Sequence, residues 1–246
     1  MINHLFIGLG GQGCRTLGEI RKVMAQRAVD TTALHDQGVE VQFLAIDSSL
    51  DVKHEKRNWS YFGTDLSLQP NDWLELSKPQ QNAVGDLAIR PDIAPWLGDL
   101  GRVASFLSQS KIEGANQRRR LGRLLFAFNA DSIAQAVFTN KVGALTAGRK
   151  NQCAFHIFAT LGGGTGSGCI LDLVATIRHR FPQSGIEEFP IFVYVYATDE
   201  DISGADVGYF FRNCSGTPAK LPQLRHRRVA LERHDQGLVG IEGLLV

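Results

Sequence analysis

A glycine-rich stretch at residues 161–168 constrains this chain more than any other part of its sequence. It reads Leu-Gly-Gly-Gly-Thr-Gly-Ser-Gly, so five of its eight residues are glycine. An apolar run of strand length, residues 153–160, comes directly before it, and residues 169–178, directly after it, predict a buried helix. The glycines are therefore expected at a strand-to-helix turn, where an α/β sheet binds ligands.

Such a turn favours an anion, because free N–H groups and the helix dipole point toward it. Glycine allows positive φ and leaves no Cβ between an N–H group and a phosphate oxygen. Two hydroxyl residues, Thr165 and Ser167, can add donors. The alternative is a flexible turn or a tight crossing of strand and helix. Five glycines together with two hydroxyl residues favour phosphate binding.

A second glycine turn follows the first predicted strand, residues 4–7. Glycines at positions 8, 10 and 13 satisfy GxGxxG, and a helix is expected from Thr16 to about residue 28. A second strand is expected at residues 39–46, with Asp47 at its end. This order is that of a Rossmann opening, in which the acid accepts a hydrogen bond from a ribose hydroxyl. Asp47 could equally cap a turn.

The middle of the chain is polar and irregular at residues 51–110, which predicts an insertion with short helices across the sheet edge. Gly114-Ala115-Asn116 then leads into a loop with arginines at positions 118–120 and 123, followed by a helix from Leu124 to about residue 140. The arginines could form a solvated turn or face phosphate. Nucleic acid is disfavoured, because the net charge of the chain is only +1.

A further strand is expected at residues 189–196, where continuous apolar character predicts burial on both faces in a parallel sheet. The acids at positions 199–201 follow it and could meet a ribose or base, or simply belong to a loop. Beyond Phe211 the apolar pattern ends. We therefore expect one nucleotide-binding domain at residues 1–210 and a loosely ordered tail at residues 211–246.

Composition narrows the class of protein further. No apolar run reaches the ~18 residues of a membrane-spanning helix. The chain enters a strand directly, without the basic start and cleavage site of a signal peptide. The four cysteines lack CxxC spacing, which argues against zinc and against a disulfide framework. These features favour a protein of the reducing cytoplasm.

Two glycine turns on parallel strands, the second reading GGGTGSG, resemble the tubulin/FtsZ superfamily, whose signature is GGGTG(S/T)G. Residues 7–13 resemble the first nucleotide loop of that family, and residues 43–47 resemble the strand and polar residue that follow. Gly114-Ala115-Asn116 resembles the loop that approaches the γ-phosphate. The long insertion and the basic loop are most similar to the large bacterial tubulin-like proteins.

The resemblance implies a Rossmann-like α/β fold with a mostly parallel sheet and helices on both faces. It also implies binding of GTP or GDP, with Mg²⁺ held mainly by phosphate oxygens and water. The residues that would contact the nucleotide are Gly10, Gly11, Gln12 and Gly13 under the phosphates, Gly163, Gly164, Thr165, Gly166 and Ser167 at the α- and β-phosphates, Gly114, Ala115 and Asn116 near the γ-phosphate, and Asp47 at the ribose.

In that family an acidic loop from a second domain enters the nucleotide site of the next subunit and activates water. The sequence after Phe211 predicts neither that loop nor the central helix that carries it. We therefore expect the chain to bind GTP but to hydrolyse it poorly, and a full-length form to associate into protofilaments. The abrupt loss of apolar periodicity suggests a shifted reading frame near Phe211. That interpretation requires a helical pattern to continue in another frame.

Two alternatives remain at this point. An NAD(P)-binding Rossmann domain of an oxidoreductase would use Gly8, Gly10, Gly13 and Asp47, and would leave the second glycine turn unexplained. A polymer or scaffold component could instead hold its nucleotide only as a structural element.

Overall fold

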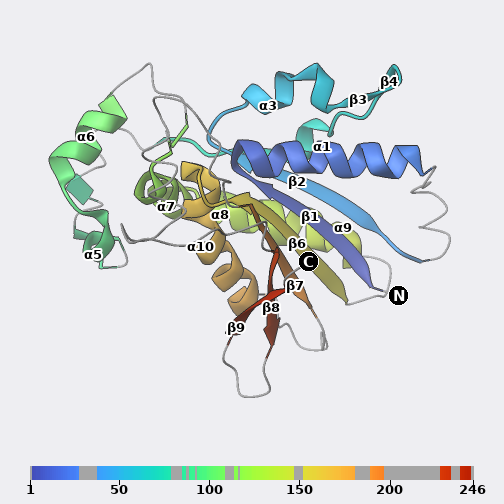
Figure 1. The fold of residues 1–246 in the computed structure, drawn as a ribbon. Helices are drawn as coiled ribbons and strands as arrows, with labels where there is room; N and C mark the ends of the chain where they lie inside the picture. The colour runs from blue at the N-terminus through green and yellow to red at the C-terminus, as the bar shows by residue number, and fades with distance from the viewer. Residues whose placement is uncertain are drawn as a thin grey trace.

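A wholly parallel five-stranded sheet, with strand order β5-β2-β1-β6-β7, forms the centre of the molecule (Figure 1). Its strands are β1 (Asn3–Leu9), β2 (Val41–Asp47), β5 (Trp73–Glu75), β6 (Cys153–Thr160) and β7 (Ile191–Tyr196). The computed structural model describes residues 2–27, 38–78, 85–86, 89–91, 93–108, 114–115, 117–146, 152–180, 189–196, 228–233 and 239–244.

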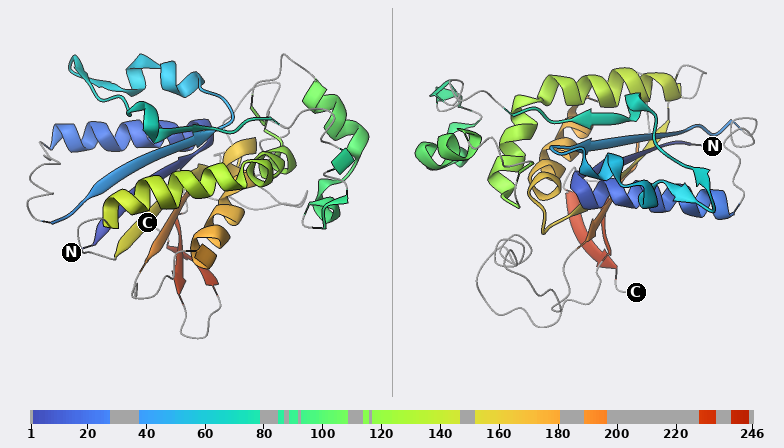
Figure 2. Two further views of the ribbon diagram at one scale, coloured as in Figure 1. Left: turned by 180° about the vertical axis from the view of Figure 1, so that it is seen from behind. Right: turned by 90° about the horizontal axis from the view of Figure 1, so that it is seen from above.

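Helices cover both faces of the sheet, which confirms the α/β fold expected from the sequence (Figure 2). One face carries α1 (Gly10–Gln26), whose Cys14 and Leu17 pack on Phe43 and Phe158. The other face carries α7 (Arg119–Phe128), α8 (Ala130–Ala134), the π-helix η3 (Gln135–Val142), α9 (Gly143–Thr146) and α10 (Gly164–Arg180). No helix in the described part of the chain is long and apolar enough to cross a lipid bilayer.

The insertion at residues 51–110 contains the expected short helices and also a strand of the main sheet. Its elements are α3 (Asp51–His54), η1 (Lys56–Asn58), β3 (Ser60–Tyr61), β4 (Thr64–Asp65), η2 (Pro70–Asp72), β5, α5 (Ala94–Leu97) and α6 (Leu100–Ser108). β5 pairs in parallel with β2 and forms one edge of the sheet. A three-residue strand in a polar segment is too short to leave a periodic signal in the sequence.

Both helices that follow glycine turns begin earlier than the sequence predicts. α1 starts at Gly10 rather than at Thr16, and α10 starts at Gly164 rather than at Cys169. The glycines are therefore the first turns of the helices and not loops that precede them. Glycine lowers helix propensity, but at Gly10, Gly13, Gly164 and Gly166 the neighbouring backbone leaves no room for a side chain.

The predicted basic loop is also partly helical, because α7 begins at Arg119 rather than at Leu124. α7 is followed by α8, η3 and α9, which extend to Thr146. The predicted start is too late because the five apolar or aromatic residues in a row begin only at Leu124, and the arginines that precede them show no apolar periodicity.

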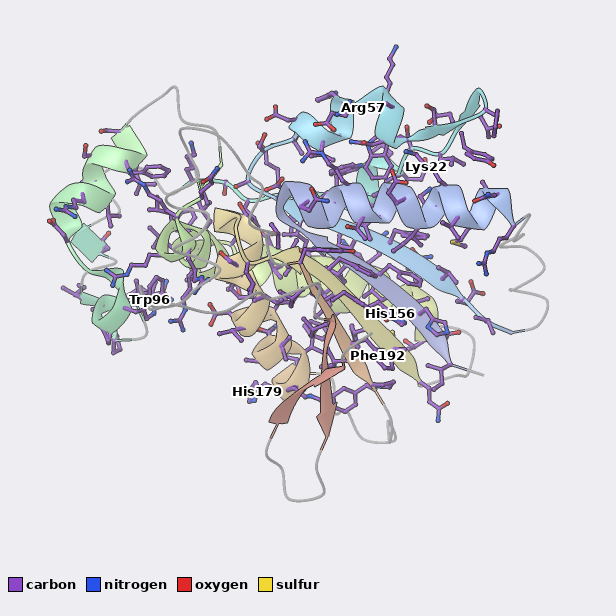
Figure 3. All side chains as sticks on the ribbon, in the orientation of Figure 1. Lys22, Arg57, Trp96, His156, His179 and Phe192 are labelled. Carbon is purple, nitrogen blue, oxygen red and sulfur yellow. The ribbon has the colours of Figure 1, made fainter. Side chains whose placement is uncertain are left out.

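The prediction that the strand at residues 189–196 is buried on both faces is wrong. Phe192 and Tyr196 of β7 are 39% and 40% exposed, whereas Ile191 and Val193 are buried. Phe192 stacks on His156 of β6, with ring centroids 5.1 Å apart (Figure 3). Aromatic side chains tolerate this half-exposed position because only part of each ring needs to leave water.

Part of the segment for which the sequence predicts a loosely ordered tail has regular structure. β8 (Arg228–Arg233) and β9 (Val239–Leu244) form a two-stranded antiparallel sheet, and β8 lies beside β7. The other residues of the predicted tail lie outside the described part of the chain.

The backbones of α7 and α10 are in direct contact where the two helices cross. A Cβ added to Gly122 of α7 would lie 2.1 Å from the carbonyl oxygen of Gly164, and one added to Gly168 of α10 would lie 2.6 Å from the nitrogen of Arg123. Both distances are far below van der Waals contact. This crossing fixes where α10 begins, and therefore where the second glycine turn lies.

We expect Gly122→Ala to lower the free energy of unfolding by about 1–3 kcal/mol, because the methyl group forces the two helices apart. Gly143→Ala is the matched control. Gly143 has helical angles (φ −56°, ψ −43°) and an added Cβ would lie 3.6 Å from its nearest neighbour, so this change should be neutral or stabilising by up to about 1 kcal/mol. Urea denaturation measures both, and equal effects would contradict the steric explanation.

Candidate functional site

The carboxyl ends of β1 and β6 border a topological switch point. From β1 the chain continues to β2 on one side, and β6 lies on the other side of β1. In open α/β sheets the crevice at such a point is where ligands bind. Both glycine turns lie here, because α1 begins directly after β1 and α10 begins shortly after β6.

The two glycine turns touch each other through their backbones. Gly10 has φ +70°, and a Cβ on it would lie 2.9 Å from the nitrogen of Gly166. A Cβ on Gly166 would lie 2.7 Å from the carbonyl oxygen of Leu9. Two turns that are more than 150 positions apart in the sequence are therefore in direct contact. We call the backbone that they form together, around Gly10 and Gly166, the glycine surface.

The predicted γ-phosphate loop reaches the same place. A Cβ on Gly164 would lie 2.8 Å from the Cβ of Ala115. Gly114 has φ +71°, and a Cβ on it would lie 3.1 Å from the hydroxyl oxygen of Ser48. The structure thus brings Ala115 to the second glycine turn and Gly114 to Ser48. Asn116, the third residue predicted for this loop, lies outside the described residues.

Asp47 and its neighbours connect the turns. The carboxylate is 6% exposed and accepts a hydrogen bond from the N–H of Ser48 at 2.7 Å. The hydroxyl groups of Ser48 and Thr165 lie 2.6 Å apart and share a hydrogen bond. Burial raises the pKa of the Asp47 carboxyl from 3.8 to about 6, and hydrogen bonds from the Ser48 N–H and the Thr165 hydroxyl work against that rise. The acid is therefore part of the site and not a solvated turn residue.

The first turns of α1 and α10 supply backbone N–H groups that their own helices do not use. The N-terminus of α1 has no side-chain cap, and neither helix has an acidic residue in its first turn. Two helix dipoles therefore place partial positive charge at one edge of the sheet. This arrangement can stabilise an anion that carries several negative charges.

Three of the predicted site residues have surroundings that the sequence did not predict. The Ser167 hydroxyl donates to the carbonyl oxygen of Gly163, one turn back in the chain. A Cβ on Gly13 would lie 2.2 Å from the carbonyl oxygen of Phe158, so this glycine is required where α1 crosses β6. The side chain of Gln12 is exposed to solvent.

Two of the arginines predicted for the basic loop face the insertion. Arg123 makes a bidentate ion pair with Asp172 of α10, at 2.9 and 3.2 Å, and its guanidinium lies 4.6 Å from the ring centroid of Trp96. Arg118 lies 5.3 Å from the ring centroid of Phe106. These contacts attach α5 and α6 to the start of α7. The acids predicted at positions 199–201 lie outside the described residues.

Arg15 lies next to the glycine surface and was missed by the sequence reasoning. Its Nη1 is 3.7 Å from the position that a Cβ would take on Gly11, and the Oδ2 of Asp47 is equally close to that position. Arg15 follows Gly11 by four residues, which places both on one helix face. The late predicted helix start concealed this relation, because it left Arg15 in a loop.

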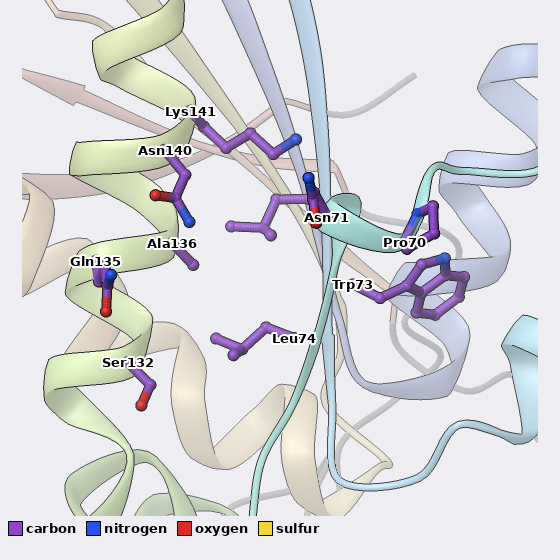
Figure 4. Close-up of a pocket in the computed structure, with 10 residues that line it drawn as sticks. Pro70, Asn71, Trp73, Leu74, Ser132, Gln135, Ala136, Asn140 and Lys141 are labelled. Carbon is purple, nitrogen blue, oxygen red and sulfur yellow. The ribbon is translucent and has the colours of Figure 1, made fainter.

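A cavity of about 760 Å³ lies elsewhere, between η3 and the start of β5 (Figure 4). It is lined by Leu44, Pro70, Asn71, Trp73, Leu74, Ser132, Gln135, Ala136, Asn140 and Lys141, none of which is a predicted site residue. The ammonium group of Lys141 is paired with Asp72. The cavity is therefore separate from the glycine surface.

Comparison with known proteins gives a family match and a fold match. A sequence model of the family described as tubulin like matches residues 5–207, well over half of the chain. CetZ from Methanosaeta thermophila strain DSM 6194 has a similar fold, with a TM-score of 0.54 at 13% identity over 88% of this chain and 41% of that one. No curated protein matches the sequence.

Two further solved structures are similar at lower scores. CetZ1 from Haloferax volcanii, a GDP-bound monomer, gives a TM-score of 0.49 at 15% identity over 88% of this chain and 46% of that one. CetZ2 from the same organism, a GTPγS-bound protofilament, gives 0.48 at 14% identity over 88% and 44%. The chain thus spans less than half the length of each of these proteins. At 13% identity, the likeness to the protein from Methanosaeta thermophila shows the fold alone.

We expect Asp47→Asn to stabilise the protein without ligand near neutral pH. The folded-state pKa of Asp47, about 6, lies above its ordinary 3.8, so between these values the folded state binds a proton that the unfolded state has released. Stability therefore falls as pH rises through this window, by up to about 3 kcal/mol. The gain from the substitution should be largest above pH 6 and should vanish near pH 4.

Urea denaturation from pH 4 to 8 measures this effect. Asp131→Asn, which removes an exposed carboxylate on α8, is the matched control and should show no such pH-dependent gain. A gain for Asp47→Asn that stays constant across the whole pH range would show that burial of the charge is not its cause.

Proposed function

This chain belongs to the tubulin-like family, and from that premise we propose that it binds a guanine nucleotide, GTP or GDP, at the carboxyl ends of β1 and β6. The observation that carries the proposal is the backbone contact between Gly10 and Gly166. It joins two helix N-termini at one edge of the sheet, and Ala115 of the Gly114 turn contacts Gly164 there. A dinucleotide site of the Rossmann type requires only the first of these turns.

In this proposal the backbone provides most of the phosphate contacts. The first turn of α1, Gly10 to Gly13, lies under the phosphates, and the first turn of α10 donates to the α- and β-phosphates. The Thr165 hydroxyl can release Ser48 and donate to a phosphate oxygen. We assign the predicted loop of Gly114, Ala115 and Asn116 to the γ-phosphate, and Asp47 can accept from a ribose hydroxyl.

Mg²⁺ enters the proposal together with the nucleotide. The described residues contain no group of three or more His, Cys, Asp or Glu side chains that could hold a metal ion. Mg²⁺ keeps several waters and binds well to phosphate oxygens, with one or two protein oxygens at most. The buried carboxylate of Asp47 makes such a cation favourable, because above pH 6 it would otherwise repel the phosphates.

Assembly and hydrolysis are the wider part of the proposal. We infer that a full-length form associates into protofilaments in the cytoplasm and that an acidic loop of the next subunit completes the site. This inference is supported by membership of the family. A bacterial source and a changed reading frame near Phe211 remain predictions. The CetZ proteins named above come from archaea.

We expect GTP and GDP, but not NAD⁺, to raise the thermal stability of the purified chain in the presence of Mg²⁺. A ligand at about 100 times its dissociation constant adds roughly 2.7 kcal/mol to the free energy of unfolding. A titration with GTP, ATP and NAD⁺, followed by thermal unfolding, separates the candidates. Stabilisation by NAD⁺ alone would overturn the guanine-nucleotide proposal.

Thr165→Val tests the site within the same assay. Removal of the hydroxyl should weaken GTP binding about tenfold, the loss expected for one charge-assisted hydrogen bond. Thr146→Val is the matched control, because Thr146 also lies in a helix and its hydroxyl bonds the carbonyl oxygen of Val142 far from the site. Equal affinities of the two variants would exclude Thr165 as a phosphate ligand.

We expect the isolated chain to hydrolyse GTP slowly, because in this proposal the acid that activates water comes from the next subunit. Phosphate release measured at several protein concentrations tests this. Rapid hydrolysis that is independent of concentration would show that one chain contains the whole catalytic site.

A further inference from the structure

The missing side chain of Gly11 leaves a niche beside the first turn of α1. Three groups border it: Nη1 of Arg15 at 3.7 Å, Oδ2 of Asp47 at 3.7 Å and Cγ2 of Val52 at 3.5 Å from the position of an added Cβ. Arg15 can reach the niche because helical side chains lean toward the N-terminus of their helix. A cation, a carboxylate and a methyl group thus surround one small space at the proposed phosphate site.

Glu55 holds the guanidinium of Arg15 in place. Nε of Arg15 donates to Oε2 at 3.1 Å, and Nη2 donates to Oε1 at 2.5 Å. The side-chain amide of Asn58 also donates to Oε2 of Glu55. The hydrogen bond from Arg15 is the main reason why the pKa of Glu55 is lowered. Glu55 is therefore an ionised, doubly anchored partner for two of the three nitrogens.

The third nitrogen, Nη1, has no hydrogen-bond partner among the described residues and borders the niche at Gly11. Its two N–H groups are available to an acceptor. The Arg15 side chain is 39% exposed, so solvent reaches it and an incoming ligand can do so as well. Arginine suits this task, since its planar fork can bind one carboxylate through two nitrogens and still donate from the third.

We propose that Arg15 binds a phosphate group of the nucleotide through Nη1 and that Glu55 acts as the positioning residue for it. This inference rests on the proposed function, because it assumes that a phosphate lies at the first turn of α1. The charge of Arg15 also offsets that of Asp47 across the niche. Without Arg15, a phosphate at Gly11 would face an ionised carboxylate with only backbone dipoles to balance it.

A phosphate is the ligand group that this geometry favours over a ribose hydroxyl. A guanidinium donates only, and its hydrogen bonds to anionic oxygens are about twice as strong as those between neutral groups. The niche also adjoins the N–H groups at the start of α1, which favour negative charge. Arg15 should therefore distinguish nucleotides from the nucleoside.

Calorimetric titration of the full chain with GTP, GMP and guanosine, with Mg²⁺ present, tests the proposal. Arg15→Gln should weaken binding of GTP about tenfold or more and leave binding of guanosine within about twofold. Arg27→Gln is the matched control, because it removes the same charge from an exposed position at the opposite end of α1 and should leave all three affinities unchanged. Thermal unfolding shows whether each variant is folded. If Arg15→Gln does not fold, Arg15→Lys replaces it and should lose an intermediate part of the affinity for GTP.

A double-mutant cycle tests the role of Glu55. Glu55→Ala should weaken GTP binding when Arg15 is present and should have no effect in the Arg15→Gln background. An equal loss in both backgrounds would show that Glu55 does not act through Arg15. Two results would overturn the role of Arg15 without affecting the proposed function. In one, Arg15→Gln binds GTP within twofold of the original chain. In the other, Arg15→Gln loses as much affinity for guanosine as for GTP. Failure of the original chain to bind GTP would instead overturn the proposed function.

Discussion

Backbone-to-backbone contact between glycines is the constraint on which the rest of this structure depends. Gly10 touches Gly166, and Gly122 touches Gly164, each at a distance that excludes any side chain. Several glycines that a sequence motif would assign to phosphate binding are therefore required by packing as well, whether or not a phosphate is bound. Glycine content by itself does not identify a ligand site here. What points to one is where these contacts lie, at the switch point of the sheet and between two helix N-termini.

Long apolar strands and the position of the turns could be predicted from the sequence. The predicted bounds of β6 match the structure, and the order of turns along the chain places them correctly at one sheet edge. Helix starts could not be predicted, because glycines and arginines in a first helical turn show no apolar periodicity. That error concealed Arg15. The exposed rings of Phe192 and Tyr196 escaped prediction because an all-apolar strand does not reveal which of its faces remains open.

Charge at the candidate site is balanced over short distances. Two helix N-termini and Arg15 favour an anion, whereas the buried carboxylate of Asp47 opposes one. Burial, rather than a neighbouring charge, is the main reason why the pKa of Asp47 is raised. A site of this kind responds to whatever neutralises that single carboxylate, whether a proton, a divalent cation or the guanidinium that faces it.

The glycine contacts divide the site into parts that can and cannot vary. At the backbone crossings a single added carbon meets main-chain atoms, which have no alternative conformation to adopt. The hydroxyl pair of Ser48 and Thr165 and the ion pair of Arg15 and Glu55 are made by side chains alone. Evolution can therefore exchange these four residues and alter ligand preference while the scaffold stays intact. Divergence within such a family should accumulate in the side chains that line the crevice and spare the glycines beneath them.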